Sequence, residues 1–337
     1  MLKNGLVQIY RGESDHTCYI PHGLCLRAAG RGLRCLIVNL APFRLINGTL
    51  EASEKLKPYF EVDNTAARAV KKNQGPADNC ITAAIERAGK SLLTGRFDLV
   101  VLCGILDFPD NGLINSGNLL SLIRKKPDHT EFILTGRHPS QDICSAADLV
   151  SDVISKSWPG TNRGYGPSIE IITGNGKGKT TYCLGKSLLA SCSGKRSTVL
   201  QFIKSPEQYG EVIASKNIPL MEITSMGKGF VFPGPEETLQ KHRKAAERAW
   251  KSAQEHLLSG HYQFIVLDEI NVAMSLGLLD PAEVISFLDK IPEGTRLLLS
   301  GRNAGQDIIN KSGLFIEVRE KKHPFNKGIG ARKGIEY

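Results

Sequence analysis

A glycine-rich segment in the second half of the chain carries the residues best suited to bind a charged ligand. Residues 173–181 read Thr-Gly-Asn-Gly-Lys-Gly-Lys-Thr-Thr and directly follow the apolar run 169–172. Where such a segment joins a strand to a helix, its glycines let successive backbone N–H groups converge on phosphate oxygens. Lys179 would then reach the β- and γ-phosphates of a nucleoside triphosphate, and the Thr180 hydroxyl would bind Mg²⁺. The sequence therefore predicts a nucleotide site.

The loop departs at one position from the common pattern G-x-x-x-x-G-K-[ST], because Thr173 stands where that pattern has glycine. The alternative interpretation is a surface turn rich in lysine and glycine, but the predicted order of strand, loop and helix favours nucleotide binding. We predict nucleotide contacts from the whole loop: Thr173, Gly174, Asn175, Gly176, Lys177, Gly178, Lys179, Thr180 and Thr181.

The chain also repeats itself. Residues 7–12 overlay residues 169–174 at an offset of 162, and residues 95–102 overlay residues 260–267 at an offset of 165. Each register holds over many further positions. We infer two copies of one α/β unit of roughly 150 residues, the usual size of a domain.

The copies differ in the loop. Opposite residues 177–180 the first copy has Asp15, His16, Thr17 and Cys18, which form an acidic and bulkier turn. Such a turn offers a triphosphate neither the glycine-lined N–H groups nor the lysine that the second copy provides. We therefore expect no nucleotide in the first copy.

Two carboxylates are likewise confined to the second copy. Asp268 and Glu269 follow the apolar run 264–267, and the first copy has Cys103 and Gly104 at the same positions. At the C-terminal end of a strand in a phosphate-binding sheet, a carboxylate binds Mg²⁺ or holds its water. The alternative is a solvated strand end, but both carboxylates and the loop lysine are missing together from the first copy, which we expect to be catalytically inactive.

Composition limits the class of protein. The chain has 337 residues, 41% of them hydrophobic, which is enough for two substantial cores. No run approaches the roughly 20 apolar residues of a membrane span, so we expect a cytoplasmic protein that makes no contact with a membrane. The net charge of +9 is spread among acidic residues, which favours a small polyanionic substrate over nucleic acid. The eight cysteines are scattered, which favours packing thiols over a disulfide framework or a metal site.

Strand-like and helical runs alternate along both copies. This order predicts the α/β class, with two tandem P-loop (RecA-like) domains whose mainly parallel sheets are flanked by helices. We assign residues 1–154 to the degenerate first domain, residues 155–168 to a linker and residues 169–337 to the catalytic domain. The strand-like runs are residues 6–10, 35–40, 99–102, 132–134, 169–172, 198–203, 265–267 and 297–299.

Four separated motifs of the second half resemble one known family. They are the loop 173–181, Val-Leu-Asp-Glu-Ile-Asn at 266–271, Leu-Ser-Gly-Arg-Asn at 299–303, and the C-terminal sequence 322–337. Together they closely resemble the ATP:corrinoid adenosyltransferases of the cobalamin-biosynthesis type, in which the threonine at position 173 is usual. The first half resembles the same family more weakly, in residues 27–34, 134–137 and 146–149.

The resemblance implies that a Co(I) corrinoid attacks the 5′ carbon of ATP and displaces inorganic triphosphate. It implies catalytic roles for Lys179, Asp268 and Glu269, and a Mg²⁺ ion held by Thr180 and Glu269. It also implies that Arg302 contacts the phosphates or the corrinoid, although a structural ion pair is an alternative role for this arginine.

The resemblance further implies that Phe230 and Phe232 bind the corrinoid. In this family an aromatic pair packs where the lower base of the corrinoid would sit, which favours a four-coordinate cobalt. The family commonly has tryptophan at the second position, so Phe232 is a departure. The alternative for both residues is core packing at strand spacing.

Two partners follow from the resemblance: an electron donor, namely a reduced flavoprotein, and a second copy of the fold. The family forms homodimers, so we interpret this chain as a pseudo-dimer within one polypeptide, with further oligomerisation left open. Two other functions stay open on the sequence alone. They are a P-loop ATPase or kinase, which would form ADP, and a non-catalytic protein that binds ATP or a corrinoid.

Overall fold

The computed structural model describes residues 2–40, 46–72, 77–108, 115–157, 168–232 and 234–337. Within these ranges, twelve strands form one sheet in the order β3-β2-β4-β5-β1-β6-β12-β7-β11-β10-β8-β9. The strands of the first half are β1 (Val7–Gly12), β2 (Cys35–Asn39), β3 (Phe60–Asp63), β4 (Leu99–Cys103), β5 (Glu131–Gly136) and β6 (Leu149–Ser157). Those of the second half are β7 (Ser168–Thr173), β8 (Ser197–Gln201), β9 (Met221–Ser225), β10 (Phe264–Asp268), β11 (Arg296–Ser300) and β12 (Leu314–Lys322).

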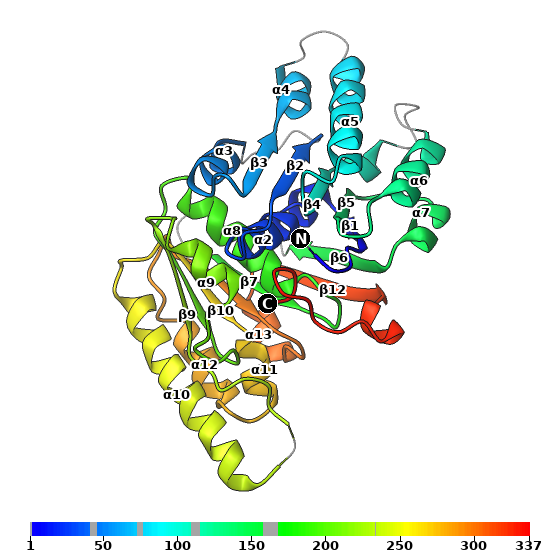
Figure 1. Ribbon diagram of the computed structural model, residues 1–337. Helices are drawn as coiled ribbons and strands as arrows, with labels where there is room; N and C mark the ends of the chain where they lie inside the picture. The colour runs from blue at the N-terminus through cyan, green and yellow to red at the C-terminus, as the bar shows by residue number, and fades with distance from the viewer. Residues whose placement is uncertain (1, 41–45, 73–76, 109–114, 158–167, 233) are drawn as a thin grey trace.

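The strand order of the second half mirrors that of the first. Within each half every strand pair is parallel. The halves meet at β6 and β12, which pair antiparallel with Val153 opposite Val318 (Figure 1). These two valines are equivalent in the repeat, at the offset of 165. A pseudo-twofold axis therefore passes through this pair, as at the isologous interface of a homodimer.

The α/β class and the tandem repeat are confirmed, and the two copies share one continuous sheet. The expected strand runs did not include β3, β6, β9 or β12. The sequence of β12, Leu-Phe-Ile-Glu-Val-Arg-Glu-Lys-Lys, ends in charged residues and is only partly buried, so it lacks a continuous apolar run. Of the linker expected over 155–168, residues 155–157 belong to β6 and residue 168 begins β7. Residues 158–167 lie outside the described ranges.

Helices cover both faces of the sheet. A single core lies under α2, α3, α8 and α9 and runs across both halves. On the opposite face, α5, α6 and α7 cover the first half, and α10 to α13 cover the second. The helices of the first half are α1 (Ser14–Thr17), α2 (Tyr19–Ala29), α3 (Ile46–Lys55), α4 (Thr65–Lys72), α5 (Ala77–Leu93), α6 (Ser116–Lys125) and α7 (Gln141–Ala146). Those of the second half are α8 (Lys179–Ser191), α9 (Gly210–Ser215), α10 (Glu236–Leu258), α11 (Ile270–Ser275), α12 (Pro281–Leu288) and α13 (Gln306–Asn310).

The helices α2 and α8 pack against each other at the centre of the molecule (Figure 1). Two equivalent glycines permit this contact. A Cβ atom on Gly23 would overlap the carbonyl oxygen of Thr181, and one on Gly185 would overlap that of Tyr19. The contact is reciprocal, because Tyr19 and Thr181 are also equivalent at the offset of 162. The first half therefore packs directly against the first turns of α8.

None of the helices in the described residues is long and apolar enough to cross a membrane. The same residues contain no group of three or more His, Cys, Asp or Glu arranged to hold a metal ion. The eight cysteines are free thiols.

We expect Gly23→Ala to destabilise the chain by about 1–3 kcal/mol, because the new methyl group forces α2 away from the backbone of α8. Urea unfolding would measure the loss. Gly330→Ala is the matched control, since nothing lies within 4 Å of the added Cβ there. Equal stability of the two variants would show that the helices are free to separate without cost.

Candidate functional site

The glycine-rich loop joins β7 to α8, as the sequence predicted, and β12 fixes its shape. The N–H of Gly176 donates to the carbonyl oxygen of Val318 at 2.8 Å. The backbone N–H of Glu320 donates to the side chain of Asn175 at 3.0 Å. Gly178 has a φ of 125°, a left-handed conformation that glycine adopts without strain. The loop is therefore held in place by the strand that joins the two halves.

Two side chains of the loop bond within the loop, and a third bonds to the turn after β11. Lys179 donates from Nζ to the carbonyl oxygen of Gly176 at 2.7 Å, and Thr181 donates from Oγ1 to that of Gly178 at 3.1 Å. The hydroxyl oxygen of Thr173 accepts from the backbone N–H of Ala304 at 3.3 Å, a contact that glycine could not make. The variant residue thus ties the loop to the turn after β11.

The two carboxylates after β10 occupy different environments. Asp268 is buried, and its Oδ1 accepts from the hydroxyls of Thr180 at 3.0 Å and Ser300 at 2.6 Å, while Gln201 donates to Oδ2 at 3.3 Å. Glu269 has a φ of 65°, unusual for a residue with a side chain, and lines the cavity described below. Asp268 therefore positions Thr180, whereas Glu269 faces the cavity.

Burial shifts the pKa of two of the charged groups that line the cavity, Lys179 and Glu269. It lowers the pKa of Lys179 to about 8, with the nearby Arg302 adding to the effect. It raises the pKa of Glu269 to about 7, with the neighbouring Asp268 adding to the effect. Both groups are thus costly to charge in the free chain and gain a favourable partner when an anion and a cation bind.

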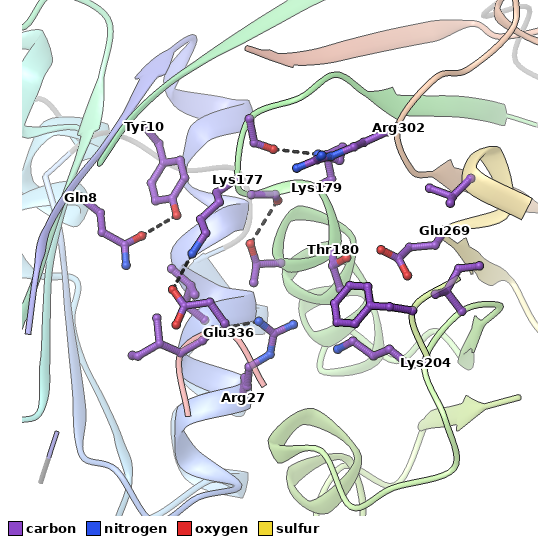
Figure 2. Close-up of a pocket in the computed structure, with 18 of the residues that line it drawn as sticks. Gln8, Tyr10, Arg27, Lys177, Lys179, Thr180, Lys204, Glu269, Arg302 and Glu336 are labelled. Atoms are coloured by element: carbon purple, nitrogen blue, oxygen red, sulfur yellow. Dashed lines mark hydrogen bonds and ion pairs between the residues drawn. The ribbon is translucent and has the colours of Figure 1, made fainter. Parts of the chain in front are cut away.

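A cavity of about 450 Å³ lies over the loop and is lined by both halves of the chain. Figure 2 shows Gln8, Tyr10 and Arg27 of the first half on one side, and Thr180 and Glu269 on the other. The first half also touches the loop itself: a Cβ on Gly178 would lie 3.0 Å from Ile20 Cδ1 and 3.2 Å from Tyr10 Cε1. The residues that line the cavity are Gln8, Tyr10, Leu24, Arg27, Gly176, Lys177, Gly178, Lys179, Thr180, Thr181, Ile203, Lys204, Phe230, Val231, Glu269, Val272, Leu276, Arg302, Ile335 and Glu336.

The C-terminal segment enters the same cavity. Glu336 accepts a hydrogen bond from Lys177 Nζ at 2.7 Å, and Figure 2 shows this pair between the two walls. Sequence reasoning did not find Glu336 or the first-half residues of the cavity. The motif 322–337 indicated that the C-terminal segment is functional. The first-half residues that line the cavity could not be found in this way, because their position depends on how the two copies pack.

The remaining predicted residues lie at the edge of the loop or the cavity. Arg302 lines the cavity, its Nη2 is 3.5 Å from the carbonyl oxygen of Asn175, and it forms no ion pair with the described residues. Phe230 and Phe232 are 80% and 74% exposed, with ring centroids 6.3 Å apart. The alternative of core packing is therefore wrong for both phenylalanines. Phe230 lines the cavity.

Comparison with known proteins places both halves in one family. The family model for ATP:corrinoid adenosyltransferase BtuR/CobO/CobP matches residues 3–164 and again residues 166–337. The chain is 29% identical to the uncharacterized protein all2391 of Nostoc sp. over 99% of its own length and 95% of that protein. Half of the chain is 36% identical to a corrinoid adenosyltransferase of Sinorhizobium sp over 79% of that protein. Half is likewise 32% identical to a corrinoid adenosyltransferase of Pseudomonas aeruginosa over 82% of that protein.

We expect Glu269→Gln to stabilise the ligand-free chain by about 3 kcal/mol at pH 8. At low pH the carboxyl group is protonated in the folded and the unfolded chain alike, so the variant gains nothing there. As the pH rises from 4.5 to about 7, only the unfolded chain releases the proton, and the wild type loses stability that the amide keeps. Urea unfolding across this range would measure the difference.

The neighbouring carboxylate provides the contrast. We expect Asp268→Asn to be destabilising, because an amide cannot accept from Thr180, Ser300 and Gln201 at once. If Glu269→Gln were no more stabilising at pH 8 than at pH 4, the ionised side chain of Glu269 would not be desolvated.

Proposed function

The chain belongs to the ATP:corrinoid adenosyltransferase family, and we propose that it transfers the 5′-deoxyadenosyl group of ATP to the Co(I) centre of a corrinoid. The observation that carries the proposal is the cavity over the loop, in which several cations and the carboxylates of Glu269 and Glu336 lie beside the exposed aromatic side chain of Phe230. In this reaction the lone pair of Co(I) forms the cobalt–carbon bond. The bond between C5′ and oxygen breaks, and the electron pair leaves on inorganic triphosphate.

The loop would then bind the leaving group. Its N–H groups and Lys179 stabilise the charge that grows on the departing oxygen, which lowers the barrier because the interaction is strongest in the transition state. Lys177, Lys204 and Arg302 line the same cavity and add positive charge. Lys179, whose pKa is lowered to about 8, regains a full charge beside the phosphates.

The residues present fit a Mg²⁺ ion bound together with the triphosphate. The hydroxyl of Thr180 and the carboxylate of Glu269 are oxygen ligands of the kind that this ion prefers. Mg²⁺ commonly binds through one or two protein oxygens plus phosphates, so it does not require a preformed cluster of carboxylates. Burial raises the pKa of Glu269, so a cation bound next to this carboxylate would stabilise its ionised form. When bound, the ion would neutralise triphosphate charge.

We assign corrinoid binding to the exposed pair Phe230 and Phe232. Large apolar side chains exposed at the rim of a cavity are typical of a binding surface. Packed against the lower face of the corrin ring, they would exclude the lower ligand and water and favour the four-coordinate Co(II) state that is easier to reduce. A reduced flavoprotein would supply the electron, and the product would serve adenosylcobalamin biosynthesis or salvage in the cytoplasm.

We propose further that only the second half binds ATP, because charged side chains occupy the corresponding region of the first half. Arg137, the equivalent of Arg302, lies 3.5 Å from the carboxylates of Glu13 and of Asp107. Lys186 is the equivalent of Leu24, a residue that lines the cavity over the loop, and it forms a buried ion pair with Glu170 at 2.6 Å. Among the described residues, the first half therefore has no unpaired cation at the equivalent of Arg302, and the equivalent of Lys179 is Thr17, which carries no charge.

Product analysis under anaerobic, strongly reducing conditions tests the proposed function. Adenosylcorrinoid and triphosphate in equal amounts would support it. ADP with phosphate would indicate an ATPase or a kinase instead, and the absence of any product would indicate a binding protein.

We expect titration calorimetry to find one ATP per wild-type chain and none on the Lys179→Ala variant, because the loss of this ammonium group removes the charge that faces the phosphates. The thermal midpoint without nucleotide should change little, since among the described residues Lys179 Nζ donates only to the carbonyl oxygen of Gly176 in its own loop. Two equivalents on the wild type would show that the first half also binds nucleotide, and one equivalent on the variant would contradict the role assigned to Lys179.

We expect Phe230→Ala and Phe232→Ala to slow adenosylation that starts from Co(II) more than adenosylation that starts from free Co(I). Electron paramagnetic resonance should show less four-coordinate Co(II) on either variant in the presence of ATP. Phe325→Ala is the matched control, because this phenylalanine is 72% exposed and does not line the cavity. Equal losses of rate from Co(II) and from free Co(I) would show that the two phenylalanines do not act by favouring four-coordinate Co(II).

A further inference from the structure

Arg27 is a buried arginine of the first half that reaches the cavity of the second. It belongs to α2, is only 4% exposed and lines the cavity over the loop. Its Nε donates to Glu211 Oε2 at 2.8 Å, and its Nη2 lies 3.4 Å from Oε1 of the same carboxylate. Its Nη1 donates to the carbonyl oxygen of Ile335 at 2.8 Å. The guanidinium group therefore joins three parts of the chain: α2, α9 and the C-terminal segment.

The first of these contacts determines where one cavity lysine lies. Glu211 is fully buried at the start of α9 and also accepts from Lys204 Nζ at 2.5 Å. Burial alone would raise the pKa of Glu211, but Arg27 and Lys204 outweigh it and hold the pKa well below its usual range. Glu211 is thus a fixed anion between two cations, and Lys204 is held at the cavity by a carboxylate that Arg27 anchors.

The second contact acts on the other cavity lysine. Ile335, whose carbonyl oxygen accepts from Arg27, directly precedes Glu336, and Glu336 holds Lys177 Nζ at 2.7 Å. Figure 2 shows Arg27, Glu336 and Lys177 in succession along one side of the cavity. Arg27 is therefore hydrogen-bonded to the carboxylate that holds Lys204 and to the residue next to the one that holds Lys177.

The repeat shows that this bridge exists on one side of the molecule. At the offset of 162, the equivalent of Arg27 is Leu189 and the equivalent of Glu211 is Thr49. In a dimer of identical chains both sites would carry the same pair. Here the Arg27–Glu211 pair is present beside the loop that contains Lys179 and is replaced by Leu189 and Thr49 at the equivalent positions. The packing of α2 against α8 therefore does not require the pair.

We propose that Arg27 is a positioning residue for the nucleotide site, through which the first half sets the places of Lys204 and Lys177. This inference rests on the proposed function for the identity of the nucleotide. The first half is then more than a cover for an apolar face. It contributes to the affinity of the second half for ATP without touching the reacting atoms.

Binding of ATP with Mg²⁺ to the full chain, measured by titration calorimetry, tests the proposal. We expect Arg27→Leu, which introduces the side chain found at the equivalent position, to weaken binding about tenfold or more, the range set by loss of a charge-assisted hydrogen bond. Arg27→Lys keeps the charge but cannot bond Glu211 and the Ile335 carbonyl together, and we expect a smaller loss. If Arg27→Leu failed to fold, Arg27→Lys would carry the test.

Two further readouts separate positioning from a general loss of stability. Hydrogen exchange at residues 335–337 should be faster in Arg27→Leu, and guanidinium ion at low concentration should restore part of the ATP affinity. The control is the double variant Glu170→Gln, Lys186→Leu, which replaces another buried charged pair by the residues at its equivalent positions, Gln8 and Leu24. We expect its ATP affinity to match that of the wild type.

Wild-type ATP affinity in Arg27→Leu and in Arg27→Lys would overturn the proposal, and so would an equal loss in the control. The proposed function is tested separately by the products that the wild type forms. If the wild type bound ATP but formed no adenosylcorrinoid, the adenosyl transfer would be rejected, whereas the affinities of the variants would still decide the role of Arg27.

Discussion

The close approach of α2 and α8 is the constraint on which the rest of the structure depends. Because Gly23 and Gly185 have no side chain, each helix lies against a carbonyl group of the other. That distance brings Ile20 and Tyr10 onto Gly178 of the loop, and it brings Arg27 within reach of Glu211 on α9. A side chain at either glycine would overlap a backbone carbonyl group of the other helix and would force the two helices apart.

The backbone arrangement of the two copies is symmetric, whereas their side chains differ. The mirrored strand order and the Val153–Val318 pair give both copies the same surroundings. The second copy has the glycine-rich loop and Glu269, and Arg27 of the first copy bonds to it at Glu211. In the first copy, Arg137 lies between two carboxylates. The second half therefore carries the loop and Glu269, whereas the first half carries one wall of the same cavity.

The sequence predicted the features that local patterns encode. The loop and the carboxylates after β10 stand out because their residue types follow strands directly, and the repeat stands out because its register is long. It did not predict β6 and β12, the strands through which the two halves pair, because both contain charged residues and lack a continuous apolar run. Nor could it separate the roles of Asp268 and Glu269, which depend on the left-handed turn at Glu269. The first-half wall of the cavity was missed because it results from packing between residues more than 140 positions apart.

The shared sheet and the single chain together have a consequence for how the site is assembled. In a homodimer, a wall contributed by the partner is lost on dilution, because association depends on the concentration of chains. Here the wall and the loop belong to one polypeptide, so the wall is present at a fixed and high effective concentration. The completeness of the site is therefore independent of how much protein is present. A substitution in one half is also not imposed on the other, so each surface can change by itself.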